Sequence, residues 1–440
     1  MASQAAQPPP GQSFFRVFGG VGALSFITYV GEYASFTIVL AFLFDQLVVT
    51  FRLGTVSYAY IGFISSGFLI SSGLIAIGMG HLCDKYGRRR MMIIGCILGA
   101  VSLYSLLIAN NLAIRGELVP FAVAVTISLV GLGIGHGTYT ASTLAYGGDL
   151  AEKHQTMGKA YGLVDGAEFA GYAFGPAVGT ALAVYFNSRT DVFIISAAML
   201  LIAAGLAVFL MPEVRSFSSG EGQVDDHGAG ARPDDHGHSH SATWGDYLNA
   251  FRTPIVGVAL LTTVVGAIGF SAFFYDVPLY ALSLDKSVTM FKSIFGYFAS
   301  VMAIAGVLFM VPFGHYEDRT NRRMPYLVVG LIGAAASLSL VFFTATVETF
   351  FAAAVAFGLC IGIVRVSQLV ILAEASRPSN RAAIMGTNHA LEHVGYGLAT
   401  AFVGVFVALL GFSDAFRVLS GILVVAGVLF LLYGRWAKVK

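Results

Sequence analysis

Charged residues are scarce in this chain of 440 residues: Asp, Glu, Lys and Arg together make up 11% of the sequence. In a soluble domain roughly a quarter of the residues are charged. So few charges cannot cover a water-soluble globule of this length, and the mean hydropathy of +0.78 points the same way. The composition therefore excludes the soluble classes of protein.

Other features are also missing. There are only three cysteines, an odd number in or beside apolar segments, so no disulfide framework is indicated. The net charge of +1 gives no reason to expect a nucleic-acid partner. The glycine-rich run Gly131–Gly137 lacks the Lys-Ser/Thr pair of a phosphate-binding loop, and no nucleophile–base set stands out. We therefore expect neither an enzyme nor a bound cofactor.

Long apolar runs are abundant. Runs such as Met91–Ala109 and Val418–Gly434 are almost free of charge and long enough to cross a hydrocarbon layer of about 30 Å as helices. The pattern predicts an all-α membrane protein with twelve transmembrane helices. The expected spans are 16–44, 56–80, 90–112, 119–147, 158–186, 191–212, 253–283, 291–314, 325–346, 349–374, 383–411 and 414–436.

A polar segment divides the spans into two groups of six. We expect a disordered tail over 1–13, a six-helix bundle over 14–212, a flexible linker rich in His, Asp and Gly over 213–250, and a second bundle over 251–440. If the amino terminus is cytoplasmic, most of the 25 Lys and Arg residues lie on the cytoplasmic side. This bias follows the positive-inside rule and predicts a multi-pass cell-membrane protein with both termini and the linker in the cytoplasm.

The two groups of six are copies of each other. Three segments recur in the same order at nearly constant shifts, which is hard to attribute to chance. Repeated halves of the same orientation are related by an axis along the membrane normal, as in carriers whose halves rock about a midplane substrate site. The matches are Gly80–Arg89 with Gly314–Arg323, Gly131–Gly135 with Gly358–Gly362, and Met157-Gly158 with Met385-Gly386.

The segment after span two, Gly80-x-x-x-Asp84-Lys85-x-Gly87-Arg88-Arg89-Arg90, resembles the signature loop of the major facilitator superfamily. The copy after span eight follows the same pattern. The resemblance covers roughly residues 14–436 and implies the twelve-helix fold of that superfamily, with two pseudo-symmetric six-helix bundles. The stretch Gly171–Gly179 in span five resembles the motif of its drug–proton antiporter branch. That branch usually has an Arg implicated in proton coupling on span four, where this chain has Leu129, so coupling by that residue is not expected.

We interpret the repeated loop as a gating latch. The carboxylate of Asp84 can meet the positively polarised N-terminus of a helix in the other half and hold the cytoplasmic side shut. The second copy would act as its partner. The latch residues are then Gly80, Asp84, Arg88, Gly314, Asp318 and Arg322.

Small residues recur every four positions in span five, next to a proline that adds a kink point. Such a stripe lets two helices approach closely, and an antiporter motif and a plain packing interface require the same geometry. The residues of this helix-packing motif are Gly171, Gly175, Pro176 and Gly179.

Ionisable residues inside apolar spans are expensive to place there and therefore informative. Arg365 is the one Lys or Arg deep within a span, and it needs an acidic partner or an anionic ligand. The sequence leaves Glu392 and Asp165 open as partners, with Glu32 less favoured. Asp165 also corresponds to His393 under the repeat, which predicts an acid and a base across the pseudo-twofold axis.

These residues supply two sets of candidates. Asp276, near the outer end of span seven beside Pro278, is expected to face the water outside. The proton-coupling candidates are Glu32, Asp165, Glu168, Glu392 and His393, and the substrate-binding candidates are Tyr29, Glu32, Tyr33, Tyr139, Arg365, Gln368 and His389.

The sequence thus predicts a secondary active transporter that moves a small organic solute by alternating access, with proton-coupled export of an amphipathic or cationic compound as the first hypothesis. One alternative is proton-coupled uptake of an organic anion or metabolite on Arg365. Another is transport of a divalent metal ion by the H-x-x-E-H residues His389, Glu392 and His393. The expected partners are a small-molecule substrate, protons and the lipid bilayer, and the expected state is a monomer without a resident metal.

Overall fold

The computed structural model describes the backbone of residues 14–154, 157–211, 254–284, 289–320, 323–341, 346–375 and 381–436. Apart from short turns between helices, these ranges are helical, and the described part of the chain contains no strand. The predicted tail over 1–13 and the predicted linker over 213–250 lie outside the described residues.

The first half of the chain forms a run of long helices that match the first six predicted spans. The first of them continues into a short π-helical segment, η1. The elements are α1 (Phe14–Phe44), η1 (Asp45–Thr50), α2 (Val56–Tyr86), α3 (Arg88–Ile114), α4 (Leu118–His154), α5 (Met157–Phe186) and α6 (Arg189–Leu210).

The second half repeats this plan. Its first pass consists of α8, a second π-helical segment η2, and α9, which follow one another without a break. The elements are α8 (Pro254–Ser271), η2 (Ala272–Asp276), α9 (Val277–Leu284), α10 (Thr289–Thr320), α11 (Arg323–Leu340), α12 (Val347–Ala375) and α13 (Arg381–Trp436).

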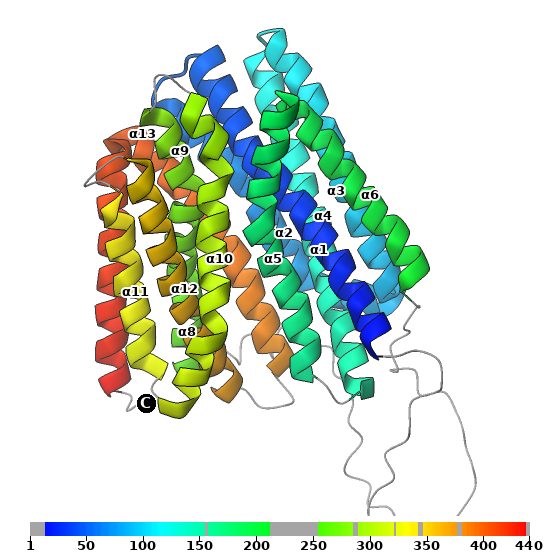
Figure 1. The fold of residues 1–440 in the computed structure, drawn as a ribbon, viewed down its shortest axis with the longest axis vertical. Helices are drawn as coiled ribbons and strands as arrows, with labels where there is room; N and C mark the ends of the chain where they lie inside the picture. Colours follow the sequence, from blue (N-terminus) through cyan, green and yellow to red (C-terminus); the bar gives the residue numbers. More distant parts are fainter. Residues whose placement is uncertain are drawn as a thin grey trace, which may run out of the picture.

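The helix α13 contains two membrane passes. The described residues include eleven helices long and apolar enough to cross a membrane, and one of them, Thr387–Tyr433, has 47 residues. A helix of that length measures about 70 Å at 1.5 Å per residue, roughly twice the hydrocarbon thickness. Its backbone is non-helical at Gly411, where φ is +79°, and the chain reverses direction there (Figure 1). The two arms of α13 are therefore the eleventh and twelfth predicted spans.

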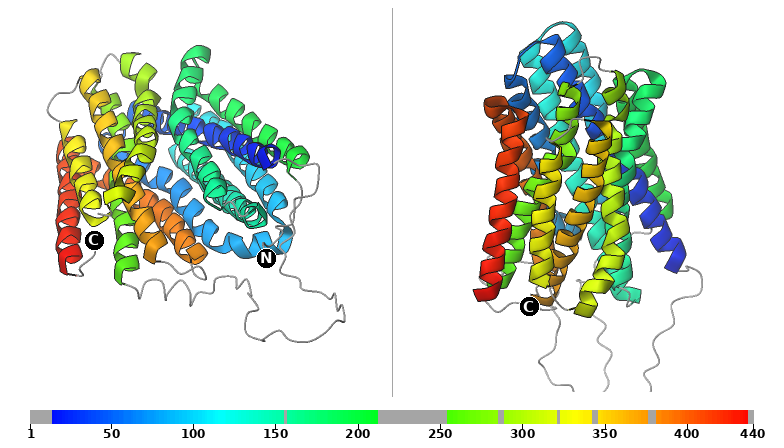
Figure 2. Two further views of the ribbon diagram at one scale, coloured as in Figure 1. Left: turned by 60° about the horizontal axis from the view of Figure 1, so that its bottom comes forward. Right: turned by 60° about the vertical axis from the view of Figure 1, so that its left-hand side comes forward.

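The helices pack as two groups. In the first half, α3 packs on α4 and α6, and α1 packs on α5 and α6; in the second, α12 packs on α10 and α11, and α8 packs on α13. The left view of Figure 2 shows the two groups beside each other. The beginning of α1 and the end of α13 lie at the same end of the bundle, toward which the two groups diverge (Figure 1).

Two helix pairs join the halves: α2 with the first arm of α13, and α5 with α10. At the first pair, a Cβ atom on Gly62 would lie only 2.6 Å from the carbonyl oxygen of Thr400, so this crossing requires glycine. At the second pair, the backbone N–H of Gly296 donates to the hydroxyl of Thr180 at 2.9 Å. The two pairs occupy equivalent places in the repeat, as a pseudo-twofold axis between the halves demands.

The segment that resembles a signature loop is mostly helical. The helix α2 continues through it as far as Tyr86, and α3 begins at Arg88. Only Gly87 lies between them, with φ at +94°, a conformation that glycine adopts without a steric penalty. The expected loop is therefore a single-residue corner between two helices.

The two π-helical segments belong to the internal repeat. The residues Ala41-Phe42-Leu43-Phe44-Asp45 return as Ala272-Phe273-Phe274-Tyr275-Asp276, a shift of 231 residues. In the first copy the π-helical turns begin at the aspartate, and in the second they end at it. The first pass of each half is thus distorted at a matching position toward the end of the bundle away from α13's last residue.

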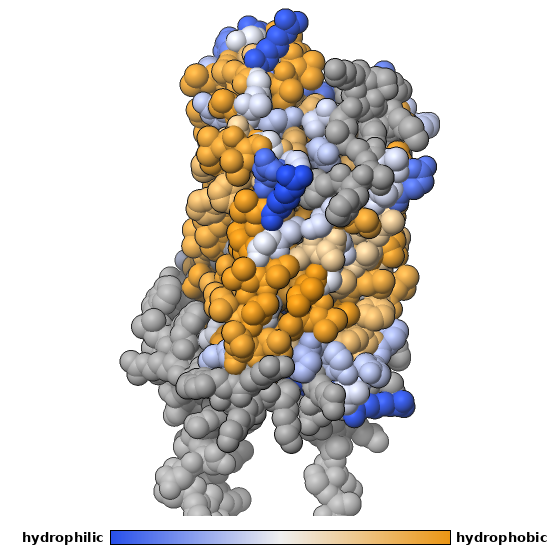
Figure 3. Space-filling model, turned by 90° about the vertical axis from the view of Figure 1, so that its left-hand side faces the viewer, coloured by the Kyte–Doolittle hydropathy of each residue, from blue (hydrophilic) through white to orange (hydrophobic). Residues whose placement is uncertain are grey.

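The outside of the bundle is apolar. Large side chains such as Phe209, which is 86% exposed, and Leu409, which is 76% exposed, project from it. On the face formed around α11 and the last arm of α13, apolar residues cover most of the height of the molecule (Figure 3). Such a surface is stable in contact with lipid chains and not with water.

Candidate functional site

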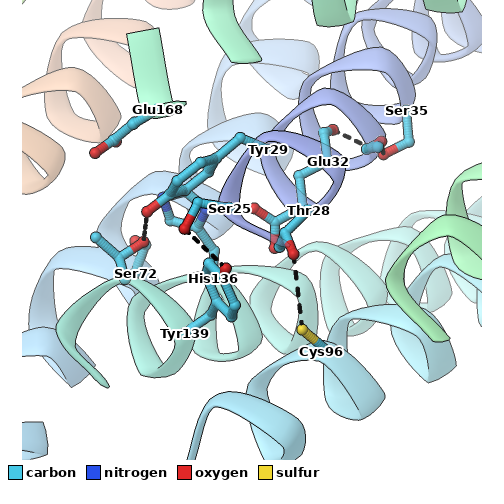
Figure 4. Close-up of polar contacts among 12 residues, drawn as sticks. Ser25, Thr28, Tyr29, Glu32, Ser35, Ser72, Cys96, His136, Tyr139 and Glu168 are labelled. Carbon is cyan, nitrogen blue, oxygen red and sulfur yellow. Dashed lines mark hydrogen bonds and ion pairs between the residues drawn. The ribbon is translucent and has the colours of Figure 1, made fainter. Parts of the chain in front are cut away.

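Ionisable side chains from both halves meet in the interior of the bundle, where α1, α4 and α5 face the first arm of α13. Glu32 on α1 and His136 on α4 are fully buried, and the carboxylate oxygen Oε2 of Glu32 lies 2.7 Å from Nδ1 of His136. Figure 4 shows this pair among the side chains of α1 and α4. Burying either group alone would be very unfavourable, so each stabilises the other in the first half.

His136 was not among the residues selected from the sequence. It lies within the glycine-rich run Gly131–Gly137, which drew attention only as a possible phosphate-binding loop. A histidine inside an apolar span satisfies the criterion that selected Glu32, so this signal was present in the sequence. The ring of His136 lies 5.7 Å from that of Tyr29 on α1 and 5.5 Å from that of Phe68 on α2, measured between centroids.

A second acid–base pair joins the halves. Nε2 of His393, on α13, lies 3.7 Å from Oε1 of Glu168, on α5. Its Nδ1 lies 3.5 Å from the hydroxyl oxygen of Ser72 on α2. The ring centroid of His393 is 5.3 Å from that of His136. The two pairs therefore form one polar path, Glu32–His136–His393–Glu168, that crosses from one half to the other.

Three of these residues also have the spacing of a loose metal-binding set. His136, Glu168 and His393 each place one nitrogen or oxygen atom within 4.8 Å of the others. Because Glu32 and Ser72 already engage the two imidazole rings, we interpret the group as an acid–base network. The H-x-x-E-H set proposed from the sequence is not assembled here, since both oxygens of Glu392 face other partners.

The partly buried Arg365 pairs with one of the two partners that the sequence left open. Nη1 of Arg365, on α12, lies 2.5 Å from Oε2 of Glu392, on the first arm of α13. The hydroxyl of Tyr396 donates to the other carboxylate oxygen of Glu392 at 2.5 Å. The guanidinium carbon of Arg365 lies 5.8 Å from the ring centroid of Phe169 on α5, a cation–π contact with the first half. The side chain of Asp165 lies outside the described residues.

A cavity opens beside this ion pair, within the second half. Its walls come from α8, α12 and α13, and Arg365 is the one basic residue among those that line it. Gln368, one turn along α12, donates from Nε2 to the side-chain oxygen of Asn388 at 2.8 Å and to the hydroxyl of Thr263. The side chains that line the cavity include Thr263, Phe270, Arg365, Gln368, Glu392 and Tyr396.

The three candidate tyrosines of the first half are buried away from this cavity. The hydroxyl of Tyr29 donates to Thr140 at 3.1 Å, and the ring of Tyr33 lies 4.0 Å from that of Tyr172 between centroids. Tyr139 is fully buried as well. His389 packs its ring 4.6 Å from that of His393. The structure therefore brings Arg365 and Gln368 to the cavity, and not Tyr29, Tyr33, Tyr139 or His389.

Asp276 does not face the water outside, contrary to the prediction. Its side chain is 3% exposed. The chain continues as α9 beyond Asp276, and the segment η2 that contains it packs against α10 and α13, which accounts for the burial. Beside it, the ring of Tyr275 lies 5.3 Å from that of Phe36 on α1, a contact between the halves.

The glycines of the packing motif lie against α1. A Cβ atom on Gly175 would lie 2.6 Å from Cβ of Tyr33, and Gly171 and Gly179 face α1 in the same way. The carbonyl group of Pro176 faces α10. This stripe thus joins α5 to α1 within the first half, next to the place where α5 meets the second half.

Few of the latch residues are described in detail. Arg88 is 8% exposed at the first turn of α3, and Gly314 lies within α10. The side chains of Asp84 and Asp318, together with Gly80 and Arg322, lie outside the part of the structure whose side chains are described. The latch remains a prediction.

A comparison with known proteins agrees with this architecture. The family model of the Major Facilitator Superfamily matches residues 21–308 and 291–438. No curated protein sequence matches the chain. The crystal structure of the nucleoside transporter NupG is similar with a TM-score of 0.71 and 14% identity, covering 94% of this chain and 98% of that one. That of a D-xylose-proton symporter gives a TM-score of 0.70 and 16% identity, covering 95% and 97%. At these identities the likeness is one of fold.

Proposed function

The chain belongs to the major facilitator superfamily, and from this premise we propose that it is a proton-coupled secondary transporter that carries a small organic solute by alternating access. Beyond the family itself, we propose that the coupling ion is the proton and that it binds to the acidic and histidine residues between the halves. The similar fold of a D-xylose-proton symporter is compatible with coupling to protons.

The observation that carries the proposal is the polar path between the halves. Glu32 and His136 belong to the first half, and His393 of the second half lies between His136 and Glu168. An imidazole beside a carboxylate forms an acid–base pair, between whose two members a proton can move. Tilting the halves apart separates Glu168 from His393. Protonation and the relative position of the halves are therefore linked.

The direction of this linkage follows from charge. When His393 is protonated, Glu168 attracts it across the interface, and the halves stay together at this level of the bundle. When the proton leaves, the attraction is lost and an ionised carboxylate is left beside a neutral ring. A transporter needs such a link, because a gradient does work only if the ion changes the preference between two conformations.

The solute site is the cavity beside Arg365. It combines hydrogen-bonding side chains, Gln368 and Thr263, with the aromatic walls of Phe270 and Tyr396. The cavity has a volume of about 30 Å³, so a small organic molecule enters only when the halves move and widen it. The guanidinium of Arg365, beside the cavity, lies 5.8 Å from the ring centroid of Phe169 in the first half, so a movement of the halves changes the surroundings of this site.

Transport into proteoliposomes tests the proposal. The full chain is reconstituted, and uptake of a panel of labelled solutes is measured with and without an imposed pH gradient, in EDTA to remove metal ions. We expect at least one solute to accumulate only when the gradient is present. Glu168→Gln should abolish accumulation and retain solute exchange, whereas Glu348→Gln, at an exposed site, should behave like the unmodified chain. Equal transport under both conditions would refute proton coupling, and loss of transport in EDTA would favour a metal ion as the substrate.

The same assay decides between export and uptake. The glycine stripe of α5 packs against α1, which any carrier of this fold requires, so it does not favour an exporter of drugs. Solute that moves with the proton identifies a symporter, and solute that moves against it identifies an antiporter.

A further inference from the structure

The imidazole rings of His136 and His393 are both held through their Nδ1 atoms. Nδ1 of His136 lies 2.7 Å from the carboxylate of Glu32, and Nδ1 of His393 lies 3.5 Å from the hydroxyl oxygen of Ser72. An ionised carboxylate only accepts hydrogen bonds, so the proton of a neutral His136 ring lies on Nδ1. Nε2 is then the nitrogen of each ring whose lone pair is left for another group.

Nε2 of His136 lacks a partner. It is buried and has no hydrogen bond among the described residues. A buried polar atom of this kind is unfavourable, and in a native protein it points to a bound water or ion. The polar groups that surround it are ligands: His136, Glu168 and His393 each place one ligating atom within 4.8 Å of the others.

The spacing of these atoms is close to that of a metal site. Zinc binds imidazole nitrogen and carboxylate oxygen at about 2.0–2.2 Å in tetrahedral geometry, so its ligand atoms lie about 3.4 Å apart. Nε2 of His393 and Oε1 of Glu168 are already separated by only 3.7 Å. Small rotations of the long Glu168 side chain and of the rings complete the approach.

Glu32 fits such a site as a supporting residue. A histidine that binds a metal nearly always donates its other ring N–H to a carboxylate, a carbonyl or water, which fixes the ring and makes it a better ligand. Glu32 and His136 have this arrangement. When both rings are neutral, the carboxylates of Glu32 and Glu168 carry two negative charges, which a divalent cation neutralises in the poorly hydrated interior.

The chemistry of the three ligands selects the metal. Two imidazole nitrogens and one carboxylate oxygen suit Zn²⁺ and similar first-row ions, whereas Mg²⁺ and Ca²⁺ prefer sets of oxygen atoms. The ligands also come from both halves, since α4 and α5 belong to the first and α13 to the second. An ion bound to all three therefore holds the halves together.

From this arrangement we infer that His136, Glu168 and His393 bind a divalent transition-metal ion such as Zn²⁺, which joins the two halves and stops the transport cycle. The ion is an inhibitor and not the transported solute. None of the three residues is among those that line the cavity beside Arg365. The binding of the ion is independent of the proposed function, and only its inhibitory effect requires transport.

Zinc binding to the purified full chain tests the inference. Histidines of the linker can bind zinc by themselves, so the starting chain has four of them replaced by Gln: His227, His236, His238 and His240. After treatment with EDTA and dialysis, calorimetry at a fixed pH gives the affinity and the stoichiometry. We expect one Zn²⁺ per chain, bound at least about a hundredfold more tightly than Mg²⁺. Zn²⁺ should also raise the temperature of thermal denaturation in detergent.

Variants of this starting chain identify the ligands. Glu168→Gln and His136→Gln should each weaken zinc binding at least about a hundredfold and remove its effect on denaturation. Glu32→Gln changes only the support of the His136 ring, so it should weaken binding by about 10–100-fold. Glu348→Gln, at an exposed site, should bind zinc as the starting chain does.

Solute exchange in proteoliposomes tests the inhibition. Zn²⁺ should slow exchange by the starting chain at least about tenfold, and EDTA should restore it. Exchange by Glu168→Gln and His136→Gln, which both variants are expected to retain, should not respond to Zn²⁺. If no solute is exchanged at all, the proposed function fails, and the binding experiment still decides on the metal site.

Three results would overturn the inference. One is that the starting chain binds Zn²⁺ no more tightly than Mg²⁺. Another is that a folded Glu168→Gln or His136→Gln variant binds Zn²⁺ as tightly as the starting chain. The third is that Zn²⁺ leaves exchange unchanged or accelerates it, because an ion that joins the halves must slow their movement.

Discussion

His136 of α4 and His393 of α13 lie with their ring centroids 5.3 Å apart, one histidine from each half of the molecule. Each has its own carboxylate, Glu32 and Glu168, and the second of these pairs crosses the interface. Proton transfer along this row would change the charge at the surface where the halves separate. The predictions below follow from this relationship and from the packing around it.

The first prediction concerns His136. His136→Gln keeps a polar side chain beside Glu32 but removes the imidazole, the group that can take up and release a proton. We expect gradient-driven accumulation in proteoliposomes to fall at least about tenfold, with solute exchange in the absence of a gradient retained. His154→Gln, near the end of the same helix α4, is the matched control and should accumulate solute normally. Full accumulation by the His136 variant would remove this residue from the proton path.

The second prediction is a pH dependence. In the proposed cycle one step requires the proton-loaded form of the polar path, and the loaded fraction falls as the concentration of protons falls. At a constant pH difference across the membrane, the initial rate of accumulation should therefore decrease when the pH of both compartments is raised stepwise from mildly acidic to alkaline values. Rates that stay constant, or that increase over this range, would show that proton loading does not limit transport.

The third prediction separates the charges of the buried ion pair from their shape. Arg365→Gln leaves Glu392 in a poorly hydrated site without its cation and should lower the free energy of unfolding by about 3–5 kcal/mol. Arg365→Gln together with Glu392→Gln should recover most of the loss, because two amides can bond to each other. Thermal denaturation in detergent measures both. If the double variant were no more stable than the single one, an unpaired Glu392 would not be the cause of the lower stability.

The fourth prediction concerns the crossing of α2 and α13. Gly62→Ala places a methyl group where only 2.6 Å separates it from the carbonyl oxygen of Thr400, so the helices must move apart. We expect a loss of about 1–3 kcal/mol in stability and slower solute exchange. Gly421→Ala, on the outer arm of α13 with no atom within 4 Å, is the control and should be neutral or slightly stabilising. Equal behaviour of the two variants would mean that the crossing tolerates a wider spacing.

The fifth prediction tests the burial of Asp276. In a chain whose native cysteines are replaced, Asp276→Cys should react poorly with a membrane-impermeant maleimide, because the side chain at this position is 3% exposed. Asp414→Cys, beyond the turn at Gly411 and 58% exposed at its side chain, should react rapidly. Rapid labelling at both positions would restore the original expectation that Asp276 faces water.

The sequence was sufficient to predict the fold because the membrane imposes a simple rule. Each pass needs a long apolar run, and the repeat of Gly80–Arg89 at Gly314–Arg323 relates the two halves. The prediction that α13 contains two passes was also confirmed, because an apolar stretch of 47 residues is too long for one pass. Local patterns in the sequence did not predict the corner at Gly87, where two helices meet with only this residue between them.

The site was only partly accessible from the sequence. The expense of a buried charge identified Arg365 and Glu392 as a possible pair, and the same argument would have identified His136 had it been applied to the glycine-rich run of α4. The prediction for Asp276 was wrong because a position near the end of a span was taken to be exposed, whereas packing against α10 and α13 buries this segment. The choice of Gln368 over the three tyrosines depends on side-chain direction, which no spacing in the sequence specifies.

The paired distortions η1 and η2 have a mechanical consequence. A π-turn holds one more residue than an α-turn, and its hydrogen bonds are less regular, so a helix bends and twists there more easily than elsewhere. Because Asp45 and Asp276 mark these segments in both copies, the first pass of each half has a more easily bent stretch at a matching place. In the proposed alternating-access cycle, the first pass of each half would bend at this stretch when the halves move.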